Sequence, residues 1–165
     1  MKYKTILIDP PWLERGVGRI KRGADRHYPL LNTEEILLVI SGCPMFKPDE
    51  DSHLYLWVTN NFLKDGLRVM ETIGFRYITN IVWVKDRIGL GQYFRGQHEL
   101  CLFGVMGRLM TRRRDIPTVI FEPKTSHSRK PESMYRLIEE ASYPPRLEMF
   151  ARNKRDGWDS WGQEV

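Results

Sequence analysis

The chain has 165 residues, 41% of them hydrophobic and 28% charged, a length and composition typical of one globular domain with a single core. No apolar run approaches the ~20 residues of a membrane-spanning helix, and the apolar run at the start is too short for a secretory signal. We therefore expect a cytoplasmic protein that does not enter the membrane, and the formal net charge of +5 is compatible with an anionic partner.

The cysteines and histidines show no spacing typical of a metal site. Cys43 and Cys101 lie far apart in the sequence, and the four histidines lack the paired spacing of zinc ligands. We therefore expect two buried, reduced thiols and no bound metal ion.

Hydrophobic periodicity divides the chain into strands and helices. In chain order we expect a strand at 4–8, a helix at 33–40, a strand at 52–59, a helix at 61–74, strands at 77–85, 98–107 and 118–123, a helix at 130–142 and a strand at 146–152. Asn32 or Thr33 is the expected cap of the first helix, and Pro131 suits the start of the last one. Because strands alternate with crossover helices, we predict an α/β protein with a mostly parallel, doubly wound sheet.

The segment Asp9-Pro10-Pro11-Trp12 directly follows the first strand. Two prolines cannot continue a strand or a helix, because each fixes φ and removes a backbone donor, but their carbonyls remain as rigid acceptors. Together with the Asp9 carboxylate and the Trp12 ring, these acceptors suit a planar ligand that carries an amino group, such as adenine or cytosine. In doubly wound sheets, ligands bind beyond the carboxyl ends of the strands, where Asp9 lies. From these four residues, a strand-ending turn capped by Asp9 remains the alternative.

Cationic residues gather in two segments of the chain. Residues 15–27 contain five Arg or Lys among glycines, and residues 110–115 contain three consecutive arginines. Such clusters fit contacts with a nucleic acid backbone, and a merely solvated loop is an equal alternative for each of them. With Arg95 from the glycine-containing stretch 89–97, the cations that we assign to substrate binding are Arg15, Arg19, Lys21, Arg22, Arg95, Arg112, Arg113 and Arg114.

The sequence DPPW after an apolar strand resembles motif IV of the amino-group adenine methyltransferases. The rest of the chain resembles the MT-A-seventy family, which contains the catalytic subunit of the eukaryotic messenger-RNA adenosine methyltransferase and many bacterial and phage enzymes. The supporting stretches occur in the order of that family, at 53–85, 96–107, 125–141 and 147–164. The resemblance implies a Rossmann-like methyltransferase fold that uses S-adenosylmethionine, in a permuted order with the catalytic strand before the cofactor strand.

The resemblance also implies roles for individual residues. Asp9 and the Pro10 carbonyl should accept hydrogen bonds from the target amino group, which turns its nitrogen lone pair toward the methyl donor. Lys130 resembles the family lysine that pairs with the methionyl carboxylate, at a helix start that also favours an anion. The implied catalytic residues are Asp9, Pro10, Pro11 and Trp12, and the implied cofactor-binding residues are Asp9, Pro11, Lys130, Phe150, Arg152, Gln163 and Glu164. Beside the substrate base we expect Trp12, which should stack on it or wall it, and Tyr28, for which packing on the core is an equal alternative.

These features together predict methyl transfer to N6 of adenine in nucleic acid, with DNA favoured over RNA. The alternatives are a non-catalytic nucleic-acid-binding subunit of a methyltransferase heterodimer, an RNA adenosine N6 methyltransferase and a cytosine N4 methyltransferase; a homo- or heterodimer is also compatible with the sequence. We expect one methyltransferase domain over 1–165 without a separate target-recognition domain, a structural or substrate-loop role for His98-Glu99, and stretch 89–97 over the substrate. Larger family members line the cofactor adenine with a segment upstream of the first strand, so other loops or a partner should supply that wall here.

Overall fold

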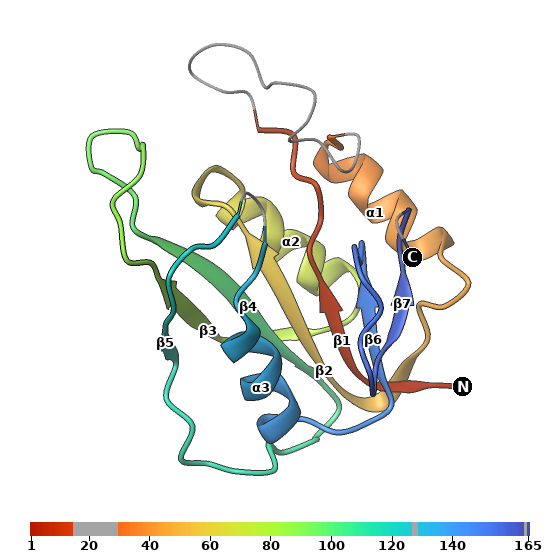
Figure 1. Ribbon diagram of the computed structural model, residues 1–165. Coiled ribbons are helices and arrows are strands. Elements are labelled where there is room, and N and C mark those ends of the chain that lie inside the picture. Colours follow the sequence, from red (N-terminus) through yellow and green to blue (C-terminus); the bar gives the residue numbers. More distant parts are fainter. Residues whose placement is uncertain (15–29, 127–128, 164) are drawn as a thin grey trace.

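A single sheet runs through the computed structural model, which describes residues 1–14, 30–126, 129–163 and 165. Its strands lie in the order β5-β3-β4-β2-β1-β6-β7 (Figure 1). They are β1 (Tyr3–Ile8), β2 (Pro48–Val58), β3 (Arg76–Val84), β4 (His98–Met106), β5 (Val119–Phe121), β6 (Arg146–Met149) and β7 (Asp159–Trp161). Of these seven, β4 runs against the rest, because it pairs antiparallel with β2 and β3 whereas the other pairs are parallel. The prediction of a mostly parallel α/β sheet is therefore confirmed.

Helices cover both faces of this sheet. The helices α1 (Thr33–Gly42) and α2 (Leu63–Thr72) lie on one face and α3 (Glu132–Ala141) lies on the other, and a short 3-10 turn, η2 (Asn60–Phe62), leads into α2 (Figure 1). Ile8 of β1 shares a core with Ile36 of α1, whereas its neighbour Leu7 shares a second core with Ile138 of α3. Successive side chains of a strand point to opposite faces, so both faces of β1 are buried and its sequence is an unbroken apolar run.

The chain leaves β1 and returns to it from the opposite side. From β1 it passes through α1 to β2 and through α2 to β3, and from β5 it comes back through α3 to β6, which pairs with the free side of β1. The order of strands therefore reverses between β1 and β6. Such a reversal is a topological switch point, where α/β sheets bind ligands beyond the carboxyl ends of the strands. Asp9 follows β1 at this point, and Phe150 follows β6.

Three local features differ from the sequence-based prediction. The strands β3 and β4 form an antiparallel hairpin within the mostly parallel sheet, and the three-residue strand β7 was not predicted. The strand β6 ends at Met149 instead of residue 152, because Phe150 takes a positive φ of 60° that leaves the extended conformation. None of the helices in the described part of the chain is long and apolar enough to cross a membrane.

The start of α1 follows the prediction closely. The side chain of Asn32 accepts from the backbone N–H of Glu35 at 2.8 Å, and the Glu35 carboxylate accepts from the backbone N–H of Asn32 at 3.0 Å. This reciprocal capping box satisfies two donors that a helix end leaves without partners. It therefore fixes where the chain enters α1, the helix that later forms a wall of the candidate site.

Candidate active site

The turn after β1 holds Asp9 at the switch point. The Trp12 N–H donates to the Pro10 carbonyl at 2.9 Å, and the Leu31 N–H donates to the Pro11 carbonyl at 2.9 Å. A carbonyl oxygen has two lone pairs, so the Pro10 carbonyl can accept one further donor. The Asp9 side chain is 29% exposed. The turn thus presents a carboxylate that a ligand can reach, with a carbonyl fixed next to it.

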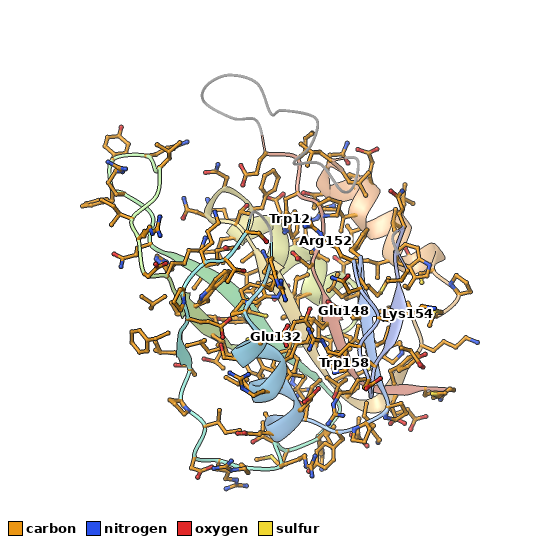
Figure 2. All side chains as sticks on the ribbon, in the orientation of Figure 1. Trp12, Glu132, Glu148, Arg152, Lys154 and Trp158 are labelled. Atoms are coloured by element: carbon orange, nitrogen blue, oxygen red, sulfur yellow. The ribbon has the colours of Figure 1, made fainter. Side chains whose placement is uncertain are left out.

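Trp12 does not offer the open stacking face that the sequence predicted. Its side chain is 4% exposed, its Nε1–H donates to the Trp57 carbonyl at 3.0 Å, and its ring stacks on Phe62 with centroids 5.3 Å apart. In Figure 2 Trp12 and Arg152 lie toward the edge of the sheet where β1 and β6 end. The buried indole anchors the diproline turn to β2 and η2, and a contact between Trp12 and a substrate base stays a prediction.

Below the turn, two carboxylates and two ammonium groups alternate. Lys130 Nζ lies 3.0 Å from Glu99 Oε1 and 3.8 Å from Asp9 Oδ1, and Lys85 Nζ lies 2.7 Å from Glu99 Oε2. The Lys130 ammonium also lies 5.0 Å from the centroid of the Trp57 ring, within reach of a cation–π interaction. Lys130 therefore lies next to Asp9, and it is held there by Glu99, which comes from β4.

The pKa values of the two carboxylates in this cluster are shifted in opposite directions. Burial raises the pKa of Asp9; Lys130 and Arg152 oppose this change and Glu99 adds to it. Burial would also raise the pKa of Glu99, but Lys130 and Lys85 outweigh it and lower that pKa to about 2. The pKa of Lys130 is raised, because Asp9 and Glu99 outweigh its burial. Glu99 thus supplies a permanent negative charge, whereas Asp9 is the more basic carboxylate and the stronger hydrogen-bond acceptor.

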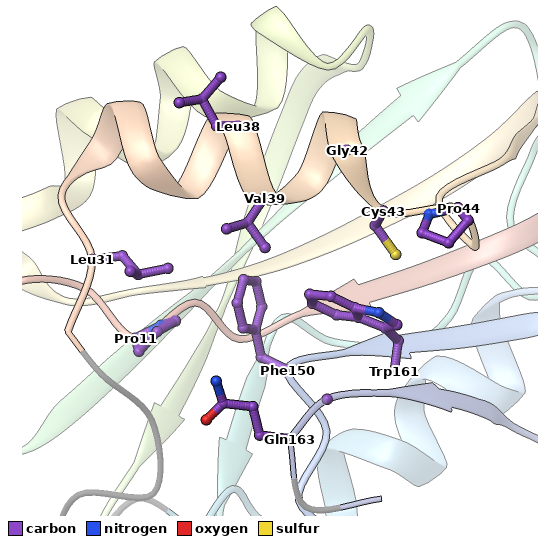
Figure 3. A pocket seen from close by; sticks show the side chains of 11 residues that line it. Pro11, Leu31, Leu38, Val39, Gly42, Cys43, Pro44, Phe150, Trp161 and Gln163 are labelled. Carbon is purple, nitrogen blue, oxygen red and sulfur yellow. The ribbon is translucent and has the colours of Figure 1, made fainter.

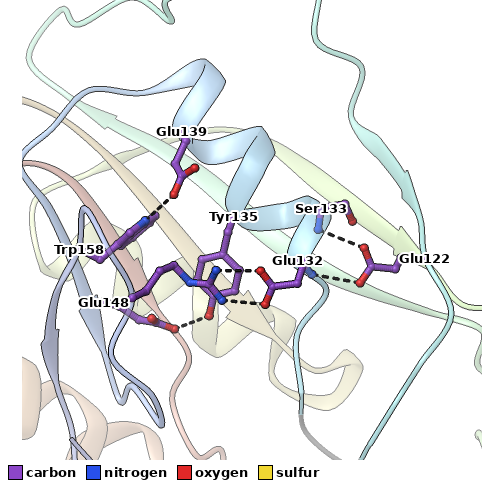
Figure 4. A network of polar contacts seen from close by, with 8 residues as sticks. Glu122, Glu132, Ser133, Tyr135, Glu139, Glu148 and Trp158 are labelled. Carbon is purple, nitrogen blue, oxygen red and sulfur yellow. Dashed lines mark hydrogen bonds and ion pairs between the residues drawn. The ribbon is translucent and has the colours of Figure 1, made fainter.

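The start of α3, next to Lys130, is capped by a side chain from another segment. The Glu122 carboxylate accepts from the backbone N–H groups of Glu132 and Ser133 at 3.0 and 3.1 Å (Figure 4). Arg155 donates to both Glu132 carboxylate oxygens at 2.8 Å. The sequence suggested that this helix start favours an anion of the cofactor, but Glu122 already fills that position. The Glu122 carboxylate therefore takes the place at the positive end of the helix dipole that a ligand anion would otherwise occupy.

Further contacts join α3 to β6 and to the segment before β7. The Tyr135 hydroxyl donates to Glu148 at 2.5 Å, and the Trp158 indole N–H donates to Glu139 at 2.9 Å (Figure 4). The Arg155 guanidinium lies 3.5 Å from the centroid of the Tyr135 ring. Burial raises the pKa of both Tyr135 and Glu148, so this pair favours its protonated forms. The network holds the end of β6, and hence Phe150 and Arg152, in place relative to α3.

A cavity of about 480 Å³ opens beside the diproline turn (Figure 3). The Phe150 ring packs edge-to-face on Trp161 with centroids 5.5 Å apart, and α1 forms the opposite wall. This volume lies within the range of sites for small molecules and cofactors, which are mostly apolar with a few placed polar groups. The lining residues are Pro11, Leu31, Leu38, Val39, Gly42, Cys43, Pro44, Phe150, Trp161, Gly162 and Gln163.

The sequence of this chain is similar to those of known methyltransferases. The family described as MT-A70 matches residues 3–164. The chain belongs to the MT-A70 family. It is 30% identical over 179 residues to a rice protein named as a probable N(6)-adenosine-methyltransferase MT-A70-like, and 26% identical over 181 residues to the human N(6)-adenosine-methyltransferase catalytic subunit METTL3. It is 29% identical over 186 residues to the Mycoplasma type II methyltransferase M.MunI.

The matches cover this chain almost completely but its relatives unequally. Each of the three alignments includes 99% of this chain, but only 23% of the rice protein and 28% of the human one. The chain thus spans about a quarter of the length of these MT-A70 relatives, whereas the alignment covers 78% of M.MunI.

The structure gathers some of the residues implied by the family and separates others. Asp9, Pro10, Lys130 and Arg152 lie at the switch point, and Pro11, Phe150 and Gln163 line the adjoining cavity. Arg95 lies in the hairpin between β3 and β4, at the same edge of the sheet as Asp9 (Figure 1). The residues that fall outside the described part of the chain are Arg15, Arg19, Lys21, Arg22, Tyr28 and Glu164.

The three consecutive arginines do not join the candidate site. The Arg112 N–H donates to the carbonyl of Ala141 at the end of α3, and Arg113 pairs with Asp115 and Glu140 at 3.0 and 3.2 Å. This end of α3 lies at the opposite edge of the sheet from Asp9 (Figure 1). The structure thus does not bring Arg112, Arg113 and Arg114 to Asp9, because tertiary contacts of the first two hold the segment at the far edge, and their contact with substrate stays a prediction.

Several residues of the site were missed at the level of the sequence. Glu99 was noted as part of a family pair, but its bonds to Lys130 and Lys85 were not foreseen. The sequence predicted the helix that contains Leu38 and Val39, but it did not indicate that these side chains line a cavity. In the described part of the chain, no three His, Cys, Asp or Glu side chains come together as a metal site.

Proposed function

We propose that this chain transfers a methyl group from S-adenosylmethionine to the N6 amino group of adenine in nucleic acid, with DNA favoured over RNA. The observation that carries the proposal is a reachable Asp9 carboxylate at the switch point, next to the Pro10 carbonyl and 3.8 Å from Lys130. The named N(6)-adenosine-methyltransferases among its relatives support adenine as the target. The high coverage of a type II methyltransferase supports DNA.

The residues of the site fit the proposed cofactor. S-adenosylmethionine supplies an electrophilic methyl group on a sulfonium. Lys130 would hold its carboxylate, since an ammonium has three donors and Glu99 uses only part of them. The apolar cavity beside Pro11 would take its adenosine, with Gln163 near the ribose hydroxyls. In this arrangement Leu31, Val39 and Pro44 would form the wall against the cofactor adenine.

Asp9 and the Pro10 carbonyl would act on the target amino group together. The amino nitrogen of adenine is a weak nucleophile, because its lone pair is delocalised into the ring. Two acceptors fixed in space can bind its two N–H groups and turn the lone pair toward the methyl group, which is catalysis by orientation. In its ionised form the Asp9 carboxylate would also stabilise the positive charge that develops on nitrogen.

Glu99 and Lys85 would act on the reaction through Lys130 and Asp9. Glu99 binds Lys130 at 3.0 Å, which keeps the ammonium between the two carboxylates. Lys85 binds the second Glu99 oxygen at 2.7 Å and so balances its charge. With two cations and two anions the cluster is close to neutral, so the region can accept a zwitterionic methionyl group without a large electrostatic penalty.

Incubation of the purified protein with radiolabelled S-adenosylmethionine and separate DNA and RNA samples tests the proposal. We expect label in DNA, less label in RNA, and loss of both in the Asp9→Ala variant. Arg113→Ala is the matched control, because it removes a charged side chain at the far edge of the sheet. A folded protein that binds nucleic acid but transfers no label would instead support a non-catalytic subunit, and label on cytosine would support N4 transfer.

A further inference from the structure

The hairpin between β3 and β4 carries large apolar side chains that the described part of the chain leaves uncovered. Tyr93 is 105% exposed, Leu90 89% and Phe94 85%. Two adjacent aromatic rings in this position would each bury a large area on contact with a partner. Large exposed apolar side chains on one short segment are typical of an interaction site.

The backbone of the hairpin holds its tip in a defined shape. The Gly89 N–H donates to the Gly96 carbonyl at 2.6 Å, which closes the base of the tip. A Cβ on Gly91 would lie 2.1 Å from the Phe94 carbonyl oxygen, so the turn is too tight for another residue there. Tyr93 takes a positive φ of 61°, which is uncommon for a non-glycine residue. The backbone at the tip thus takes an uncommon conformation next to the two exposed aromatic rings.

The hairpin projects from the edge of the sheet at which the candidate active site lies. In Figure 1 it extends beyond the carboxyl end of β3, on the same side as the end of β1. Its root is directly connected to the site, because Lys85 and Glu99, which flank it, form an ion pair and Glu99 binds Lys130 next to Asp9. A long ligand that enters the site can therefore reach the hairpin.

The charge around the tip identifies the kind of partner. Arg87 and Arg95 are exposed in the segment 85–97, and its one acid, Asp86, lies 3.5 Å from Arg87, whereas Lys85 at the root is 18% exposed and paired with Glu99. The Asp86 carboxylate accepts from the backbone N–H of Lys124 at 3.3 Å, which brings this exposed cationic residue to the root. A positive surface around exposed aromatic rings matches a polyanion that carries flat apolar groups. A second copy of the same tip would meet it with like charge, which opposes self-association.

We propose that Tyr93 and Phe94 stack on nucleobases beside the target adenine, while Arg87 and Arg95 contact the adjacent phosphates. This inference rests on the proposed function. A base that enters an active site leaves its stack, so its neighbours lose a stacking partner. Aromatic rings can replace that partner with little dependence on sequence, since every base has a π face. The hairpin is then a positioning element that holds the strand while Asp9 binds the extruded base.

Fluorescence anisotropy with labelled mixed-sequence single-stranded and duplex oligonucleotides, at several salt concentrations, tests this role. Stacking predicts that each alanine substitution, Tyr93→Ala or Phe94→Ala, weakens binding by about 5- to 150-fold. The slope of affinity against salt should stay unchanged, because no charge is removed, whereas Arg95→Ala should reduce that slope by about 1. Tyr93→Phe should keep the affinity, and Met110→Ala is the control for loss of an exposed apolar side chain at the far edge.

The outcomes separate this inference from the proposed function. Unchanged affinity in Tyr93→Ala and Phe94→Ala overturns the inference, and label transfer by the wild-type protein then still supports the function. Ring-dependent binding without any label transfer supports the hairpin role and refutes the function. Sedimentation that shows a wild-type dimer and a monomeric Phe94→Ala variant would overturn the inference in favour of a second copy. Absence of any nucleic acid binding by the wild-type protein also overturns it.

Discussion

Substitution of Glu99 by Gln tests how the charges below Asp9 are held together. The change removes the negative charge that lies between Lys85 and Lys130, while the shape of the side chain stays almost the same. The two ammonium groups, 18% and 15% exposed, then face each other with less compensation. Because both ammonium groups are largely removed from water, we expect this substitution to lower the free energy of unfolding more than the removal of an ion pair on the surface would.

The pKa of Glu99 gives the magnitude. A carboxyl whose pKa falls from 4.5 to about 2 on folding contributes about 3 kcal/mol to stability at pH 7, since a change of one unit in pKa corresponds to about 1.36 kcal/mol. Because this pKa is lowered, the contribution is complete above the unfolded value of 4.5 and is lost as the pH falls toward 2. We therefore expect Glu99→Gln to lower the free energy of unfolding by about 2–4 kcal/mol at neutral pH.

Urea denaturation followed by circular dichroism at pH 7 and at steps down to pH 3 measures this effect. Glu140→Gln is the control, because its pair with Arg113 is about half exposed and should contribute less than about 1 kcal/mol. The difference between wild type and Glu99→Gln should shrink as the pH falls below 4.5. A difference below about 0.5 kcal/mol at pH 7, or one that grows on acidification, would contradict a stabilising role of the Glu99 charge.

Three further predictions concern the turn, the cavity and the far edge. Asp9→Asn should lower methyl transfer at least about 100-fold. It should also raise the melting temperature slightly at pH 7, because the raised pKa of Asp9 means that its ionised form disfavours folding. A lower melting temperature of this variant would contradict the second expectation. Val39→Trp should fill part of the cavity and weaken S-adenosylmethionine binding about 10-fold in calorimetry, and unchanged binding excludes this cavity as the cofactor site. Arg113→Ala should leave nucleic acid affinity within about twofold in anisotropy, because its partners are Asp115 and Glu140; a larger loss would return this segment to the substrate surface.

The sequence predicted the sheet and the place of Asp9 because both depend on local patterns. The run Ile6-Leu7-Ile8 is apolar on both faces and ends at two prolines, so its identity as a buried strand and the position of its end follow directly. The strand β7 was missed because its three residues, Asp159–Trp161, are too few to show a period. Its place in the sheet comes from pairing with β6.

The contacts within the site depend on tertiary structure and could not be predicted. Glu99 and Lys130 are 31 residues apart, and Trp12 and Trp57 are 45 apart, so no periodicity relates them. The family resemblance indicated Lys130 but not what holds it. Likewise Arg113 looked like a free cation in the sequence, and only the fold brings Glu140 to it. Charged clusters therefore predict nucleic acid contacts poorly until their partners are known.

The most direct test of the account is the identity of the methylated nucleoside. Wild-type protein and Asp9→Asn would be incubated with S-adenosylmethionine and either DNA or RNA, and the digested products analysed by mass spectrometry. We expect N6-methyladenine in DNA from the wild-type protein and none from Asp9→Asn. A different methylated nucleoside, or equal amounts of N6-methyladenine from both proteins, would contradict it.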